Sequence, residues 1–455
     1  MQLMRLTRPD LTGTLRSVVD GSVLTSDDPG YDESRTPFFR HRIGRPAAVV
    51  RPRHAAAVAA TVSVAANSGT PLQVRGGGHT AHSTGEGLLL DVRSLTGIDL
   101  ELSDHTAWVG SGHTAGTLTD ALGRHGTAVG FGDTPSTAIS GLTLGGGVGF
   151  LARRHGLTID NLLAAEIVTA EGQTRLVDPA HDADLFWAIR GGGGNFGVVT
   201  RFRYRLARVA EVYGGLLVLS ATPRIIAEVA GVCAGADREL TVIVNILPAP
   251  PLPGIPPEQV GRPVLMARVC HTDPAVAEAA VRPLRRVATP LLDQLQPMPY
   301  PALLEETPDR GTRPALQTLF VNRIDETAGA AILGHLAEAR SPLRLVQFRV
   351  LGGAIGDRPA DETAYAHRDA PVLVMIVHGD EPGLGWADRW ARQVRADLDQ
   401  GVAGAYVNFL GPGDDRIQAA YPGPTFARLR AVKTAYDPQN LFRHNLNITP
   451  EGLAA

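Results

Sequence analysis

The segment with the most specific chemistry is a glycine turn that ends in a histidine. Three glycines at 76–78 follow a run at 72–75 that predicts a strand, and His79 comes directly after them. Glycines at a strand end let backbone N–H groups approach a diphosphate closely, because no Cβ atom is in the way. A neutral imidazole is also a nucleophile. The turn therefore predicts a nucleotide-binding loop whose histidine either bonds a cofactor covalently or only hydrogen-bonds it.

Two further glycine clusters follow, at 141–149 and 191–197. A single cluster is as readily a tight turn as a binding loop, but several in one region favour a cofactor. A nicotinamide-type fold needs G-x-G-x-x-G at the start of a helix, with an acidic residue about twenty positions later. Neither the 76–79 turn nor the Gly110-Ser111-Gly112 segment has that spacing. The clusters therefore predict a dinucleotide site of another kind.

His82 is a second histidine beside the same turn. Its separation from His79 resembles that of some metal-ligand pairs. No set of cysteine or carboxylate ligands with metal-site spacing accompanies it. We place His82 near the cofactor and expect no metal.

Two polar side chains alternate with apolar ones in a strand predicted near position 347. Gln347 and Arg349 are separated by Phe348, and side chains two positions apart on a strand point to the same face. That face is either the substrate-binding one or the solvent-exposed one, and the pattern fits both.

The elements that must position these residues fall into three stretches. From 45 to 206, short apolar runs alternate with helical patterns, which is typical of an α/β domain. From 207 to 404, strands and helices predict a second α+β domain with a mostly antiparallel sheet. Strands are predicted at 47–50, 72–75, 88–92, 107–110, 163–169, 197–204, 216–219, 240–247, 264–269, 343–350, 372–377 and 406–409, and helices at 54–67, 114–124, 274–287, 325–340, 385–399 and 424–436.

Four segments, in this order along the chain, carry a family resemblance. They are VRGGGHT (74–80), SGLTLGGGVGFLARRHGLTIDNLLAAEIVTAEG (140–172), DLFWAIRGGGGNFGVVT (184–200) and RLRAVKTAYDPQNLFRHNLNI (428–448). They resemble the berberine bridge enzyme-like branch of the vanillyl-alcohol oxidase superfamily. The resemblance implies an α+β protein with a PCMH-type FAD-binding domain made from both chain ends, 1–206 and 405–455. A substrate domain at 207–404 is inserted between them.

The resemblance also implies how the flavin is attached. His79 matches the family histidine that is bonded to the 8α-methyl group of the flavin ring. Many relatives add a second bond from a cysteine, and here Thr134 stands at that position. The only cysteines, Cys233 and Cys270, lie far away in apolar surroundings that suggest buried thiols rather than a disulfide. We therefore expect FAD with a single covalent bond.

Tyr406 is similar to the tyrosine that family members place over the flavin as a base. A tyrosine hydroxyl has an ordinary pKa of about 10 and needs a neighbouring cation or hydrogen bonds to serve this way. The other interpretation is an aromatic side chain packed between domains. The cofactor-binding residues that the resemblance implies are Arg75, Gly76, Gly77, Gly78, His79, Thr80, His82, Thr134, Thr137, Gly141, Gly145, Gly146, Gly149, Val198, Tyr406, Asn408, Asn445 and Asn447.

Composition limits the partners of this chain of 455 residues. A formal net charge of -3 gives no basic field for a nucleic acid. Neither an export signal nor a membrane-spanning apolar run is expected, so we predict a cytoplasmic protein with a small-molecule substrate.

The favoured function is oxidation of a secondary alcohol, a phenol or a polyketide-type natural-product intermediate. Hydride would pass to flavin N5, and molecular oxygen is the expected electron acceptor. The alternatives are a flavin-bound cyclase or isomerase without net redox, and a non-catalytic protein that binds a metabolite or drug.

Overall fold

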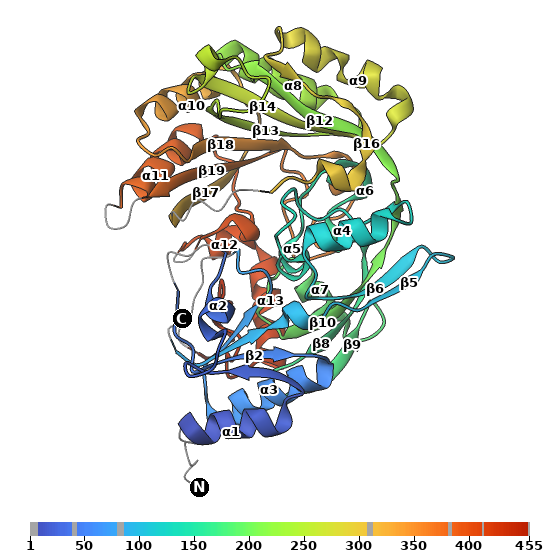
Figure 1. Cartoon of the computed structure of the whole chain (residues 1–455), viewed down its shortest axis with the longest axis vertical. Helices are drawn as coiled ribbons and strands as arrows, with labels where there is room; N and C mark the ends of the chain where they lie inside the picture. Colours follow the sequence, from blue (N-terminus) through green and yellow to red (C-terminus); the bar gives the residue numbers. More distant parts are fainter. Residues whose placement is uncertain are drawn as a thin grey trace.

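The computed structural model describes residues 8–38, 43–79, 86–306, 313–380, 385–411 and 414–453. Figure 1 shows a wide sheet covered by helices in its upper half. Both chain ends lie in the lower half, with the C-terminal helix α13 beside segments from the first half of the chain. The glycine clusters belong to the lower half.

The first sheet holds the strand that leads into the glycine turn. Its order is β1-β2-β4-β3, and β4 pairs in parallel with both β2 and β3. Helix α3 runs from β2 to β3, with His54 as its N-cap and Gly69 in the left-handed conformation after its end. The elements are α1 (Arg8–Val18), β1 (Gly21–Leu24), α2 (Tyr31–Arg35), β2 (Ala48–Pro52), α3 (Ala55–Ser68), β3 (Leu72–Arg75), β4 (Leu88–Asp91) and the 3-10 turn η1 (Val92–Ser94).

The second sheet carries the other two glycine clusters on its connections. Its order is β5-β6-β10-β8-β9, and each of its pairings is antiparallel. The capping box of Thr114 and Thr117 starts α4. The elements are β5 (Ile98–Glu101), β6 (Thr106–Gly110), α4 (Ala115–Gly123), β7 (Thr127–Ala128), α5 (Ile139–Gly145), α6 (Ala152–His155), η2 (Thr158–Asn161), β8 (Leu162–Val168), β9 (Thr174–Val177), α7 (Ala183–Ile189), β10 (Val198–Arg205) and β11 (Ala207–Arg208).

The third sheet has eight strands in the order β15-β12-β14-β13-β18-β19-β17, with β16 paired to β12. The pairings are antiparallel. Alternate side chains such as Val346 and Phe348 pack with helices α8 to α11 in one core. The elements are β12 (Glu211–Ser220), α8 (Pro223–Gly235), β13 (Leu240–Pro248), η3 (Pro257–Gln259), β14 (Pro263–His271), α9 (Pro274–Val287), β15 (Leu292–Asp293), β16 (Gln296–Pro299), η4 (Tyr300–Leu303), β17 (Arg313–Val321), α10 (Glu326–Glu338), β18 (Arg344–Val350), η5 (Gly353–Ile355), β19 (Val372–Asp380) and α11 (Trp386–Leu398).

The C-terminal segment returns to the lower half of the molecule. Leu429, Val432 and Ile448 share a core with Leu185 of α7 and Phe202 of β10. A PCMH-type domain built from both chain ends is therefore confirmed, as is the α+β class. The elements are η6 (Val407–Phe409), α12 (Ile417–Ala420) and α13 (Pro424–Tyr436).

Several sequence predictions need correction. The segment 406–409 forms a 3-10 turn where a strand was expected. Helices α7 and α8 and strand β17 were not predicted. Cys233 and Cys270 are both buried and free, as expected. Among the described residues, no helix is long and apolar enough to cross a membrane.

Candidate active site

One cavity of about 910 Å³ lies between the glycine loops and the eight-stranded sheet. This is the size of a site for a large organic ligand. Three parts of the chain form its wall. The first comprises the loops after β3 and around 132–144, and the second comprises the 193–199 segment with the C-terminal residues 407–410 and 442–446. The third comprises the sheet strands β13, β14, β18 and β19. The cavity thus brings together segments that are far apart in the sequence.

Two of the glycine segments are in direct contact along this wall. A Cβ atom at Gly76 would lie 2.4 Å from Ser140 Oγ, and one at Gly77 would lie 2.9 Å from the Ala138 nitrogen. Gly78 has a φ of +75°, which side chains rarely adopt. Only glycine fits this turn, and its backbone faces the cavity.

Arg75 forms an ion pair with a buried carboxylate next to the turn. Its Nη2 lies 2.8 Å from Asp91 Oδ2, and Arg51 and Arg93 contact the same oxygen at 2.9 and 2.7 Å. Burial raises the pKa of Asp91, but the hydrogen bond from Arg93 and the charges of Arg75 and Arg93 outweigh it and lower the pKa to about 2. Three guanidinium groups on one carboxylate leave excess positive charge beside the glycine turn, which suits a diphosphate.

His79 lies on the cavity wall and stacks on Phe38, with ring centroids 3.9 Å apart. Burial lowers the pKa of its imidazole to about 4, against a hydrogen bond with the Ser136 backbone that raises it. The ring is therefore neutral at physiological pH, which is the nucleophilic form. Thr80 and His82 lie outside the described residues.

Buried polar atoms of the C-terminal segment that lack a hydrogen-bond partner indicate whether the cavity suits a polar cofactor. Asn445 and His444 lie on the wall. Among the described residues, neither Asn445 Oδ1 nor His444 Nε2 has a hydrogen-bond partner, although both atoms are buried. Buried polar atoms are almost always paired in folded proteins. The wall therefore fits a large ligand that has its own hydrogen-bond donors and acceptors, and FAD is such a ligand.

Most of the predicted cofactor residues lie on this wall. The ones found there are Arg75, Gly76, Gly77, Gly78, His79, Thr134, Thr137, Gly141, Val198, Asn408 and Asn445.

Gly145, Gly146 and Gly149 differ from the expectation, because they make room for protein rather than for a ligand. A Cβ atom at Gly145 would lie 2.0 Å from Asn408 Oδ1, and one at Gly149 would lie 2.6 Å from the Phe131 oxygen. A Cβ atom at Gly146 would meet the Tyr406 ring at 3.2 Å. None of the three is on the described wall.

Tyr406 lies behind the wall, in contact with Asn408, which is on it. The Tyr406 oxygen accepts hydrogen bonds from the Gly147 N–H at 2.9 Å and from Asn408 Nδ2 at 3.1 Å. Burial raises the pKa of the Tyr406 hydroxyl and outweighs these two donors and the charge of Arg349, which act in the opposite direction. Tyr406 is the N-cap of the 3-10 turn that contains Asn408, where a strand was expected. Asn447 also lies off the described wall.

Gln347 and Arg349 lie on the face of β18 that forms the cavity wall. They belong to a row of polar contacts in which Gln347 Nε2 donates to Asn245 Oδ1 at 2.8 Å and Arg349 Nε donates to Gln347 Oε1 at 2.9 Å. Arg349 Nη2 then reaches Asp133 Oδ2 at 3.1 Å. The row joins the eight-stranded sheet to the loop that carries Thr134.

Asp133 is a site residue that the sequence analysis missed. Burial raises the pKa of its carboxyl, but the charges of Arg349 and Arg268 and the hydrogen bond from Arg349 outweigh burial and hold the pKa below its ordinary value. The carboxyl is therefore ionised at neutral pH. Its position next to Thr134 was the only signal in the sequence. Apolar side chains surround the polar row, among them Leu247, Leu316, Leu345, Met375 and Phe409.

Comparison with known proteins defines the class. The model for "FAD binding domain" matches residues 46–178, and the model for "Berberine and berberine like" matches residues 405–449. The chain is 30% identical over 427 residues to the FAD-linked oxidoreductase OXR1 of Pyricularia oryzae, covering 85% of this chain and 80% of that protein. It is 28% identical over 454 residues to (R)-6-hydroxynicotine oxidase of Paenarthrobacter nicotinovorans, covering 95% and 98%.

A solved structure agrees with these matches. The crystal structure of 6-hydroxy-D-nicotine oxidase from Arthrobacter nicotinovorans superposes with a TM-score of 0.84 at 26% identity, covering 95% of this chain and 98% of that one. The fold and site thus define an FAD-linked oxidoreductase. More narrowly, the chain belongs to the berberine bridge enzyme-like family, which confirms the resemblance seen in the sequence.

Proposed function

We propose that this protein is an oxidase that carries FAD on His79 and oxidises a small hydroxylated organic molecule. The observation that supports it is the single cavity that joins the glycine loops to the polar row on the substrate sheet. Related proteins are named as oxidases of 6-hydroxynicotine and of gluco-, chito- and xylooligosaccharides. The chemistry that bound FAD supplies is hydride acceptance at N5 and return of the electrons to oxygen.

His79 is the group proposed to hold the flavin. Its imidazole is neutral because burial lowers its pKa to about 4, and its stacking on Phe38 fixes the ring plane. No cysteine lies on the part of the wall that the structure describes, and Thr134 occupies the loop position. These features support a single covalent bond. Two free buried thiols also favour a reducing compartment such as the cytoplasm.

Tyr406 is the proposed proton acceptor. The two hydrogen bonds that its oxygen accepts, from Gly147 and Asn408, would stabilise a phenolate. Asn408 connects the hydroxyl to the cavity because it contacts Tyr406 and also lines the wall. Asp133 is a second candidate, since it is a carboxylate on the wall, but its low pKa makes it a weaker base.

The substrate class follows from the chemistry of the sheet face. Asn245, Gln347 and Arg349 present amide and guanidinium groups that hydrogen-bond oxygen atoms. The apolar side chains around them suit a carbon skeleton. We therefore propose a secondary alcohol, a phenol or a polyketide-type natural-product intermediate.

The test is anaerobic mixing of the purified holoprotein with a panel of secondary alcohols, phenols and polyketide-type compounds. An oxidase substrate bleaches the visible absorbance of the flavin, and oxygen then restores the colour while hydrogen peroxide appears. Conversion of a compound without bleaching would instead support a cyclase or isomerase. Binding with neither change would support a non-catalytic binding protein.

A further inference from the structure

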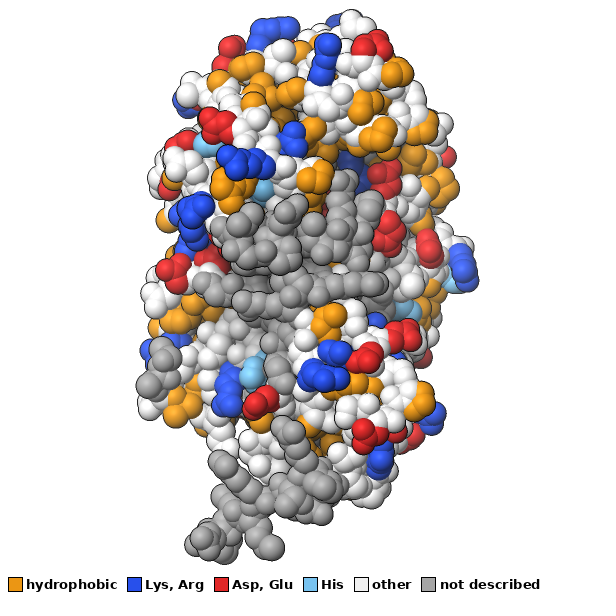
Figure 2. Space-filling model, turned by 60° about the vertical axis from the view of Figure 1, so that its left-hand side comes forward, with side chains coloured by type: hydrophobic (Ala, Val, Ile, Leu, Met, Phe, Trp, Pro, Cys, Tyr) orange, Lys and Arg blue, Asp and Glu red, His pale blue; other side chains and the backbone are white. Residues whose placement is uncertain are grey.

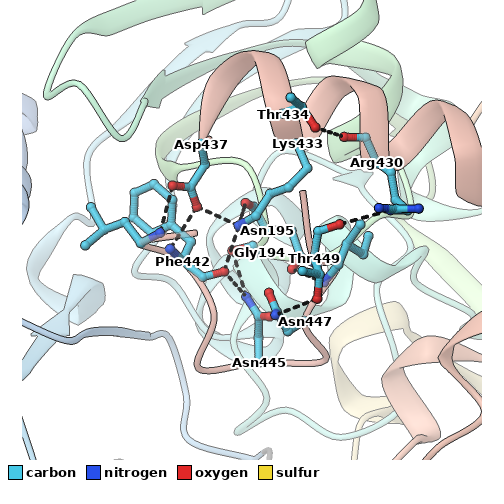
Figure 3. A network of polar contacts seen from close by, with 12 residues as sticks. Gly194, Asn195, Arg430, Lys433, Thr434, Asp437, Phe442, Asn445, Asn447 and Thr449 are labelled. Atoms are coloured by element: carbon cyan, nitrogen blue, oxygen red, sulfur yellow. Dashed lines mark hydrogen bonds and ion pairs between the residues drawn. The ribbon is translucent and has the colours of Figure 1, made fainter. Parts of the chain in front are cut away.

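A buried ion pair sits behind the part of the wall that the C-terminal segment forms. Lys433 of α13 and Asp437, which directly follows that helix, are both fully buried, and Lys433 Nζ lies 2.5 Å from Asp437 Oδ2. Lys433 Nζ also donates to the Asn195 oxygen at 2.8 Å and to the Phe442 oxygen at 3.1 Å (Figure 3). All three ammonium donors are used. The pair thus touches the third glycine cluster and the C-terminal segment at once.

Asp437 connects the ion pair to the backbone that follows α13. Its Oδ1 accepts the Leu441 N–H at 2.8 Å, and its Oδ2 accepts the Phe442 N–H at 2.9 Å. The carboxylate is therefore fixed by backbone donors as well as by the lysine. The chain after α13 must leave the helix along the path that these bonds define.

Asn195 connects the buried ion pair to the cavity wall through its hydrogen bonds. Its Nδ2 donates to the Gly192 oxygen at 2.9 Å and to the Leu446 oxygen at 3.1 Å, and its Oδ1 accepts the Ile448 N–H at 2.9 Å. The network thus ties two wall segments, 193–195 and 442–446, to a single ammonium group.

The orientation of Asn445 is determined by its neighbour. Its Nδ2 donates to the Gly194 oxygen at 2.9 Å. A carbonyl oxygen only accepts hydrogen bonds, so the amide nitrogen must face it and Oδ1 must be the free acceptor. That buried oxygen has no partner among the described residues and belongs to a residue of the wall. It therefore suits an N–H or O–H donor of a bound flavin nucleotide.

We propose that Lys433 and Asp437 are positioning residues for the cofactor. They hold the 193–195 loop and the 442–446 segment so that the Asn445 amide oxygen accepts a hydrogen bond from FAD. Neither residue touches the cavity. The proposal rests on the cavity being the FAD site and on no choice of substrate.

A purely structural role would not require a charge at position 433. Leu429 and Val432 already anchor α13 in the apolar core, and a buried ammonium is costly to desolvate. Burial lowers the pKa of Lys433, while the charge of Asp437 and its hydrogen bond oppose this shift. Unlike an apolar side chain, the lysine holds three acceptors in place, which are two backbone carbonyl oxygens and one carboxylate oxygen.

The test measures FAD affinity in a His79→Ala background, where binding is an equilibrium. Lys433→Met alone leaves Asp437 buried without its cation and can unfold the chain. The main variant is therefore Lys433→Met combined with Asp437→Asn, which removes both charges together. We expect a thermal unfolding midpoint close to that of the parent, an FAD dissociation constant raised about tenfold, and an altered visible spectrum of the bound flavin, as loss of an outer-shell partner produces at other sites.

Arg430→Met is the matched control. Arg430 lies on the same helix, and its Nε donates to the Thr449 oxygen beyond the wall segments (Figure 3). FAD affinity should be unchanged in this variant. Unchanged FAD affinity in the double variant, or an equal loss in Arg430→Met, would overturn the proposal. Because only FAD is added, failure to find an oxidised substrate would leave this result unaffected.

Discussion

His79 shows how burial prepares a side chain for chemistry at neutral pH. Its depressed pKa of about 4, which burial causes, keeps the imidazole uncharged at neutral pH. If the flavin is bonded covalently to His79, as proposed, the protein denatured in acid should retain one flavin per chain. His79→Ala should release all flavin on denaturation. The ratio of flavin to protein after gel filtration in denaturant measures this, and free flavin from the wild-type chain would exclude the covalent bond.

Asp91 gives a prediction on pH dependence. Its pKa is lowered to about 2 in the folded chain and is about 3.9 when unfolded, so its stabilising effect is complete above about pH 4. The effect is lost as pH falls toward 2, and amounts to about 2 kcal/mol. Asp91→Asn should therefore lower the free energy of unfolding most at neutral pH, with the difference from wild type shrinking between about pH 4 and pH 2. Urea denaturation across that range provides the measurement, and a constant difference would contradict it.

Tyr406 tests the proposed chemistry. Tyr406→Phe removes one hydroxyl and should leave flavin attachment intact. If the hydroxyl takes the substrate proton, the rate of anaerobic flavin reduction should fall by about a hundredfold or more. Substrate affinity should change little, because the interaction is made mainly in the transition state. Stopped-flow reduction with Asp133→Asn as the comparison separates the two candidates, since a large effect in Asp133→Asn alone would move the role to the carboxylate.

At the scale of elements, the contact between β18 and the loop that carries Asp133 joins the eight-stranded sheet to the part of the chain that carries the glycine loops. Arg349 is buried there and Asp133 is partly buried, and Arg349 Nη2 lies 3.1 Å from Asp133 Oδ2. Arg349→Met should lower the free energy of unfolding by about 2 kcal/mol, because the partly buried Asp133 carboxylate loses its ion-pair partner and keeps the charge of Arg268. Combination with Asp133→Asn should restore most of that loss. Denaturation of the single and double variants measures it, and additive losses would show that the two groups act independently.

Periodic patterns allowed many of the elements to be predicted. Strand 72–75 and helices 274–287 and 424–436 were predicted with the observed bounds, since alternation and caps are local features. The strand predicted at 406–409 was wrong, because Asn408 and Tyr406 pack against Gly145 and Gly146, a contact that no local pattern reveals. Asp133 was missed because an isolated acid in a loop has no pattern, and its role depends on an arginine 216 positions away.

At the scale of the whole molecule, the basic, acidic and apolar side chains that Figure 2 colours lie interspersed on the face shown. A surface of this kind gives no long-range attraction for a polyanion. The lining of the cavity, in contrast, comes from both ends of the chain. The family motifs could be read from the sequence because each is continuous, whereas their assembly into one wall required the fold.

The dependence of the cavity on both chain ends leads to the last prediction. Deletion of residues 433–455 removes Lys433, Asp437 and the wall segment 442–446 together. It also removes Ile448 from the core that α7 and β10 share. Flavin loading should be abolished, because one side of the FAD cavity is then missing.

A shorter deletion of residues 452–455 is the control, since Gly452 and Leu453 are exposed and contribute nothing to the wall. It should load flavin as the full chain does. Flavin content of the purified proteins, together with circular dichroism, is the measurement. The longer deletion should keep most of the signal of the eight-stranded sheet, because the core of that sheet and its four helices contains no described residue beyond Leu398. Normal flavin content in the longer deletion would show that the cofactor is held without the C-terminal segment.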